Sequence, residues 1–169
     1  MIFKKYLPAL VAGFGAAVLS TVPGIKNFSC CLLVPGAAVI SVLLDKKINQ
    51  SNQKIQLGKA FGFGFLTGLT ATVFITAFEM LITYITKSND FVQSLPQSEM
   101  IMRQWDLGPM VDESLKMIKS AAKEIEKTGF SFIYFLMILS SNFIINTIFG
   151  LIGGALGMSL ANRKYREEE

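Results

Sequence analysis

The residues best suited to chemistry in this sequence are a carboxylate and a row of hydroxyls within one apolar stretch, residues 60–86. Glu79 is the only acidic residue in any of the long hydrophobic runs. Four threonines share its side of a helix, since they recur around it at spacings of four and three residues: Thr72, Thr76, Thr83 and Thr86. Polar groups at membrane depth are candidates for an ion or proton site, so this stripe is the first candidate functional site.

A second stripe, within residues 130–161, repeats polar and small residues every four positions: Asn142, Asn146, Gly150 and Gly154. Depths counted from the inner ends of both stretches match three pairs: Glu79 with Asn142, Thr76 with Asn146, and Thr72 with Gly150. The stripes therefore predict an antiparallel helix pair joined by hydrogen bonds. The same stripe also suits a transport path. Glu79 also falls near the outer end of a membrane core about 20 residues deep, where a carboxylate costs little. Helix packing, a transport path and a carboxylate at the membrane interface all stay open as interpretations.

Glycines spaced four apart are frequent in the apolar stretches, and small residues let helix backbones approach closely. The expected helix-packing positions are Gly62, Gly68, Gly150, Gly153, Gly154 and Gly157. Contacts within the chain explain them, and a seam between two copies of the chain is the alternative.

The two cysteines, Cys30 and Cys31, are neighbours at the start of the second apolar stretch. Adjacent helical positions point in different directions, so the thiols do not converge on one metal ion, and a disulfide between them would be strained. We expect small buried hydrophobic side chains here. An exposed thiol that forms an intermolecular bridge, or one modified by lipid, is the alternative.

Composition excludes several classes of function. The chain has 169 residues, no histidine and a net charge of +4. Without histidine there is no His-based acid–base catalysis, catalytic triad or histidine metal site. Mean hydropathy is +0.48, which favours a bilayer as the environment. Lysines and arginines cluster beside apolar segments, so we expect no nucleic-acid partner. We expect no enzyme activity, cofactor or metal.

Four apolar stretches approach the roughly 20 residues that a bilayer core requires. They are residues 6–22, 28–44, 60–86 and 130–161, in a single membrane domain that covers residues 1–169. Basic residues lie densely at the two termini and in the loop between the second and third stretches. The segment 87–129 has six basic and seven acidic residues. The positive-inside rule then predicts a multi-pass protein with both termini cytoplasmic and this segment outside.

The outer segment contains one amphipathic helix, expected at residues 109–127. Pro109 suits the first helical turn, and Gly129 is a suitable stop. An apolar stripe runs along it: Val111, Leu115, Ile118, Ala122 and Ile125. Such a helix can lie on the outer leaflet, cover the ends of the membrane helices or dock a partner. The residues before it read as a polar connection broken at Pro96.

Weak internal similarity suggests a duplicated two-helix hairpin. "LVPGAAVISVLLDKK" from Leu33 resembles "LIGGALGMSLANRK" from Leu151, and "AGFGAA" from Ala12 resembles "FGFGFL" from Phe61. Inverted or parallel repeats of this kind occur in transporters. Chance similarity between glycine-rich apolar helices is the alternative.

Three stretches together carry a family resemblance. They are "VPGIKNFSCCLLVPGAAVISVLLDKK", "LGKAFGFGFLTGL" and "IFGLIGGALGMSLANRK". The chain resembles the small four-helix bacterial membrane proteins classed as domains of unknown function. The resemblance implies a bacterial cytoplasmic membrane location, and it implies no activity, cofactor or catalytic residue.

The sequence thus predicts an all-α integral membrane protein with four transmembrane helices and an extracytoplasmic amphipathic helix. Its expected role is that of an accessory, assembly or scaffold protein, with the lipid bilayer and other membrane subunits or a second copy as partners. The alternative is a small homo-oligomeric transporter or channel that uses the Thr/Glu/Asn stripe. A thiol-based redox protein is a third class.

Overall fold

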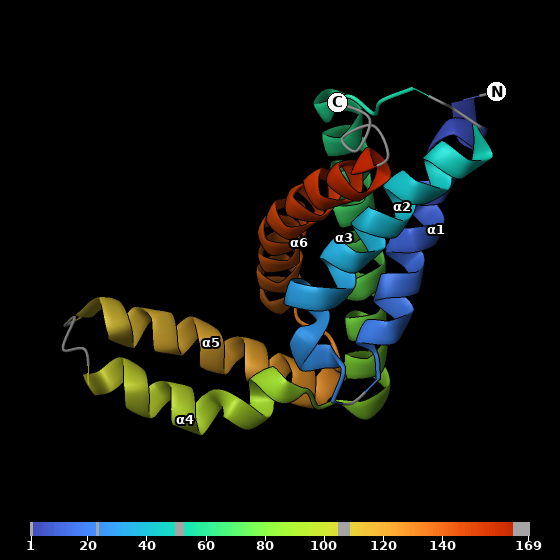
Figure 1. Ribbon diagram of the computed structural model, residues 1–169. Helices are drawn as coiled ribbons and strands as arrows, with labels where there is room; N and C mark the ends of the chain where they lie inside the picture. Colours follow the sequence, from blue (N-terminus) through green and yellow to red (C-terminus); the bar gives the residue numbers. More distant parts are fainter. Residues whose placement is uncertain (1, 23, 50–52, 105–108, 164–169) are drawn as a thin grey trace. The chain divides into compact units, whose positions relative to one another are not determined.

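The computed structural model describes residues 2–22, 24–49, 53–104 and 109–163, and within these ranges every regular element is a helix (Figure 1). The α-helices are α1 (Ile2–Ser20), α2 (Val34–Ile48), α3 (Leu57–Thr86), α4 (Asp90–Gln104), α5 (Pro109–Thr128) and α6 (Phe132–Ala161). A 3₁₀ turn (Lys26–Phe28) and a π-helical turn (Ser29–Leu33) lead into α2. The expected all-α class is confirmed.

Two helices, α3 and α6, are long and apolar enough to cross a membrane. Each has 30 residues, a length of about 45 Å. The apolar part of α1 is shorter, Tyr6–Ser20. The α2 helix has 15 residues, with Pro35 in its first turn and two lysines in its last turn, where they complement the helix dipole. Of the four predicted spans, two therefore meet the criterion of length and composition.

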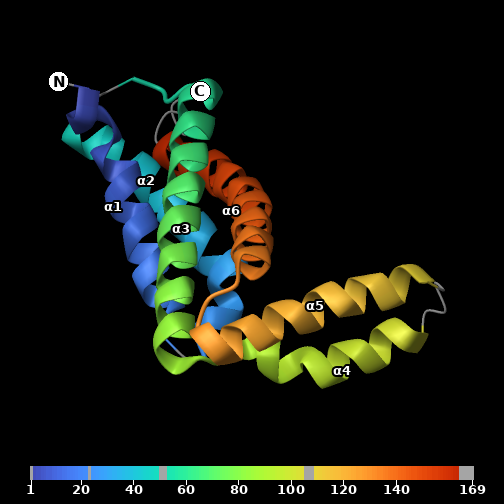
Figure 2. The ribbon, with the colours of Figure 1, turned by 180° about the vertical axis from the view of Figure 1, so that it is seen from behind.

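The chain divides into two compact units. The first, which we call the four-helix unit, contains residues 1–76 and 139–169, so α1 and α2 lie in it together with parts of α3 and α6. In both views α1 and α2 lie side by side (Figures 1 and 2). Its interior consists mainly of small and polar side chains, with a few larger ones such as Val34, Val42 and Phe63. Large apolar side chains point outward, for example Phe14, Ile40, Phe65, Ile148 and Leu156.

The second unit, residues 77–138, contains α4 and α5, which lie side by side and antiparallel (Figures 1 and 2). The observed α5 closely matches the predicted helix 109–127. Its apolar stripe is largely buried, including Val111, Leu115 and Ile125. Two ion pairs join the helices: Lys119 to Glu99 at 2.8 Å and Arg103 to Asp112 at 3.6 Å.

The expectation of a polar connection before α5 is wrong, because residues 90–104 form α4. Asn89 caps this helix, since its Oδ1 accepts a hydrogen bond from the backbone N–H of Val92 at 2.9 Å. Pro96 lies inside the helix. Its side chain is exposed, and contacts with α5 outweigh the backbone hydrogen bond that proline cannot donate.

Candidate functional site

Polar side chains of α3 and α6 meet inside the four-helix unit and bond to one another. Asn142 donates from Nδ2 to Thr76 Oγ1 at 3.1 Å, and Asn146 donates from Nδ2 to Thr72 Oγ1 at 3.2 Å. The Thr72 hydroxyl in turn lies within donating distance of two backbone oxygens, that of Asn142 at 3.0 Å and that of Gly68 at 2.9 Å. We call these four residues, Thr72, Thr76, Asn142 and Asn146, the polar seam.

The polar seam is shielded from solvent. Thr72, Thr76 and Asn146 are only 1–3% exposed. In such surroundings an amide that lacked a partner would be costly, and here each of the two amides has a threonine hydroxyl as its acceptor. The seam contains hydroxyls and amides and no titratable group. Its chemistry is therefore hydrogen bonding between helices.

The register of this pair differs by one helical turn from the register expected from the sequence. Asn142 lies opposite Thr76, where the depth argument placed Glu79, and Asn146 lies opposite Thr72. The expected register placed Ala60 and Ala161, the inner ends of the two apolar stretches, at the same depth in the membrane. In the structure Ala60 lies opposite Gly154, and residues before α3 extend along the end of α6. The expected equal depths of Glu79 with Asn142, of Thr76 with Asn146 and of Thr72 with Gly150 are therefore wrong, since Gly150 lies against Gly64 and Gly68.

Glycines flank the polar seam where the two backbones approach. A methyl group at Gly64 would collide with the carbonyl of Gly150, and one at Gly68 would collide with the carbonyl of Asn146. A methyl group at Gly154 would likewise meet the carbonyl of Ala60. Side chains at these positions would force α3 and α6 apart, which would stretch the hydrogen bonds of the seam.

Two further glycines of α6 face α2. A methyl group at Gly153 would lie 2.6 Å from the Cα of Pro35, and one at Gly157 would lie 3.0 Å from the Cα of Val39. Gly62 differs, because a methyl group there would have no neighbouring heavy atom within 4 Å. The structure thus brings Gly68, Gly150, Gly153, Gly154 and Gly157 against other helices of the same chain, and it leaves Gly62 on an open face.

Glu79 and Thr83 belong to the second unit. Thr83 is buried and accepts a hydrogen bond at 3.3 Å from Nδ2 of Asn89, the residue that caps α4. Glu79 is partly buried. The threonine stripe predicted from spacing is therefore used in two ways: Thr72 and Thr76 bond to α6, and Thr83 bonds to the residue preceding α4.

Cys30 and Cys31 lie in the π-helical turn before α2. Cys31 is exposed, so the expectation of a small buried side chain is wrong for this residue. The side chain of Cys30 lies outside the described residues.

A model of a protein family of unknown function, DUF4199, matches residues 5–159. The chain belongs to this family. The match includes the polar seam and every expected site residue, and it confirms the resemblance to an uncharacterised family. The comparisons with curated proteins and with solved structures gave no match.

Within this DUF4199 chain, the structure also brings together polar residues that spacing had not indicated. The hydroxyl of Thr67 on α3 lies 3.1 Å from that of Ser41 on α2, and both residues are fully buried. Asp45, one turn further along α2, pairs with Lys59 of α3 at 2.5 Å. In the sequence Asp45 stands next to Lys46 and Lys47, a pattern typical of a solvent-exposed loop. Its spacing from Ala38 and Ser41 puts it on the buried face of α2, and that signal was available in the sequence.

Proposed function

We propose that this chain is a multi-pass membrane protein in which α1, α2, α3 and α6 all cross the bilayer. One observation carries this proposal: the four-helix unit is built with its small and polar residues inside and its large apolar residues outside. Glycine, alanine, threonine and asparagine make up most of the interior, with a few larger side chains such as Val42 and Phe63, while most isoleucine, leucine and phenylalanine side chains cover the four helices outside. Such a surface in water would be an extended apolar patch, whereas lipid tails accommodate it.

The distribution of charge supports cytoplasmic termini in a bacterial cytoplasmic membrane. The end of the four-helix unit where α2 ends, α3 begins and α6 ends carries five basic residues: Lys46, Lys47, Lys54, Lys59 and Arg163. Basic residues next to membrane helices remain on the cytoplasmic side. We call this the basic end of the unit.

Contacts between the expected repeats support the duplicated hairpin. The helices that carry the similar segments are also neighbours, since Gly153 of α6 approaches Pro35 of α2, and Gly13 of α1 approaches Thr67, the residue that follows the similar segment of α3. A duplication would place equivalent helices around a common centre in this way.

The role we propose is that of a non-catalytic accessory, assembly or scaffold subunit. The polar seam supports this role over transport, because Thr72, Asn142 and Asn146 are engaged with one another and with backbone carbonyls. Groups that ligate a passing ion would need to exchange those bonds during each cycle. A fixed set of buried bonds instead keeps α3 and α6 together within the four-helix unit.

The decisive experiment is gentle extraction of the full-length protein from its own membrane, followed by native mass measurement and identification of co-purifying chains. A second polypeptide at fixed stoichiometry is the expected result. A lone chain or a homodimer would contradict the subunit role. Glu79→Gln would then be tested for loss of ion or solute uptake, with Thr86→Val on the same face as a matched control.

A further inference from the structure

The basic end of the four-helix unit holds a buried carboxylate. Asp45 is 2% exposed, and its two oxygens have different partners. Oδ2 pairs with the Lys59 ammonium at 2.5 Å, and Oδ1 accepts a hydrogen bond from Asn49 Nδ2 at 2.7 Å. A charge withdrawn from water in this way is tolerated only while its partners remain in place.

Beside this ion pair, Asn162 clasps the segment that precedes α3. Its Nδ2 donates to the carbonyl oxygen of Ile55 at 3.0 Å, and its Oδ1 accepts from the N–H of Ile55 at 2.9 Å. One amide side chain thus satisfies both backbone groups of a single residue, as a neighbouring strand would. The clasp fixes residues 53–56 against the end of α6.

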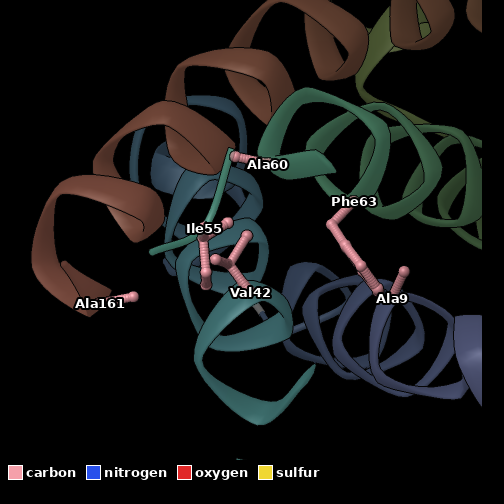
Figure 3. Close-up of a cluster of buried hydrophobic side chains, with 6 residues drawn as sticks. All are labelled: Ala9, Val42, Ile55, Ala60, Phe63 and Ala161. Atoms are coloured by element: carbon pink, nitrogen blue, oxygen red, sulfur yellow. The ribbon is translucent and has the colours of Figure 1, made fainter. Parts of the chain in front are cut away.

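The clasped segment inserts an apolar side chain between the helix ends. Ile55 is 8% exposed and belongs to a buried cluster with Val42 of α2 and Ala161 of α6. Figure 3 shows these three side chains next to one another. Lys46 adds a further link, because its ammonium donates to the carbonyl oxygen of Ala161. Three helices and one connecting segment are thereby joined around Ile55.

We propose that residues 53–56 form a strap that closes the basic end of the four-helix unit, and that the Asp45–Lys59 pair and the Asn162 clasp hold it shut. Opening of the strap admits water to the buried hydroxyls of Ser41 and Thr67, which lie one helical turn deeper. This proposal rests on contacts within the four-helix unit and does not depend on the proposed function.

The ion pair is suited to such a device because its two members differ in exposure. The Lys59 side chain is 39% exposed, so its ammonium reaches water whether or not it is paired. Asp45 has no comparable access to water while the strap is shut. Loss of the pair removes a link between the end of α2 and the first turn of α3, directly after residues 53–56, and in our proposal the strap then opens more often.

The test uses the full-length protein in micelles, with Cys30→Ser and Cys31→Ser as the background. A reporter, Ser41→Cys, is exposed to a small charged thiol reagent, and its rate of modification measures access of water. Asp45→Asn and Asn162→Ala should each raise this rate by about tenfold or more, because each removes a restraint on a buried site. Lys47→Gln is the matched control, since it removes an exposed positive charge at the same end and should leave the rate unchanged.

A second reporter, Thr72→Cys, separates a local strap from general unfolding. Its rate should stay the same in all variants, since it lies at the polar seam, away from the basic end. The strap is wrong if Ser41→Cys reacts no faster in Asp45→Asn or Asn162→Ala than in Lys47→Gln. Equal acceleration at both reporters would also contradict it. Should Asp45→Asn fail to fold, Asn162→Ala carries the same expectation without leaving an unpaired charge.

Discussion

The seam between α3 and α6 and the pairing of α4 with α5 show two different ways of joining helices. At the seam the backbones themselves approach, and buried amides and hydroxyls bond across the contact. Between α4 and α5 the contact consists of apolar side chains on the α5 stripe and of exposed ion pairs. The first arrangement suits surroundings in which apolar contact gains nothing over lipid, and the second suits contact with water.

The largest effect should come from adding a side chain at the backbone contact. Gly68→Ala should destabilise the four-helix unit by about 3 kcal/mol or more, because its methyl group would collide with the Asn146 carbonyl, which is backbone. Unfolding of the purified protein in a denaturing detergent titration measures this. Gly62→Ala is the matched control, as its methyl group has open space, and alanine favours the helix by up to about 1 kcal/mol. Equal stabilities of the two variants would contradict backbone contact at the seam.

The next largest effect is expected in α5. Leu115 is 3% exposed, so Leu115→Ala should cost about 2–3 kcal/mol through lost burial and a residual cavity. Hydrogen exchange should rise in α4 and α5 and stay constant in α1 and α2. The exposed Met117 on the same helix provides a control, Met117→Ala, with little change expected. Faster exchange throughout the chain would show that the two regions do not unfold separately.

A smaller effect is expected from one hydrogen bond of the seam. Asn146→Ala should cost about 1–2 kcal/mol, since a single buried hydrogen bond makes only a modest contribution to stability. A double-mutant cycle with Thr72→Val measures the coupling between the two side chains. Additive costs would mean that the 3.2 Å contact between them contributes nothing.

The smallest effect is expected from the ion pairs between α4 and α5. Hydrogen bonds from Lys119 and Arg103 lower the pKa of Glu99 below its ordinary value. A pKa that is lower in the folded state contributes to the stability of the fold. This contribution is complete above the ordinary pKa and is lost as the pH falls through the lowered pKa. The distribution of distances between spin labels on α4 and α5 should therefore stay constant from neutral pH down to the ordinary pKa of 4.5 and broaden as the pH falls further. Glu99→Gln should remove the part of this response that is due to Glu99, and an unchanged response would assign the broadening to other carboxylates.

Sequence patterns predicted every α-helix except α4, and they predicted the contact between two stripes, since both follow from periodicity. They did not predict the register, because periodicity shows which face of a helix is in contact but not how far the helix is shifted along its neighbour. That register is seen in contacts between residues far apart in the sequence, such as the hydrogen bond from Asn142 to Thr76. Asp45 was missed since its neighbours in sequence are lysines, and α4 was missed because Pro96 and its polar residues resemble a loop.

The close approach of α3 and α6 has a consequence for how this sequence can diverge. A contact made by backbone atoms depends on the absence of side chains at Gly64, Gly68, Gly150 and Gly154, and it places little demand on the large residues that point away. The outward isoleucines, leucines and phenylalanines can therefore be exchanged among themselves with little loss. Saturation mutagenesis should show intolerance on the faces of α3 and α6 that meet other helices, repeating about every 3.6 residues, and tolerance of apolar exchanges on the outward faces.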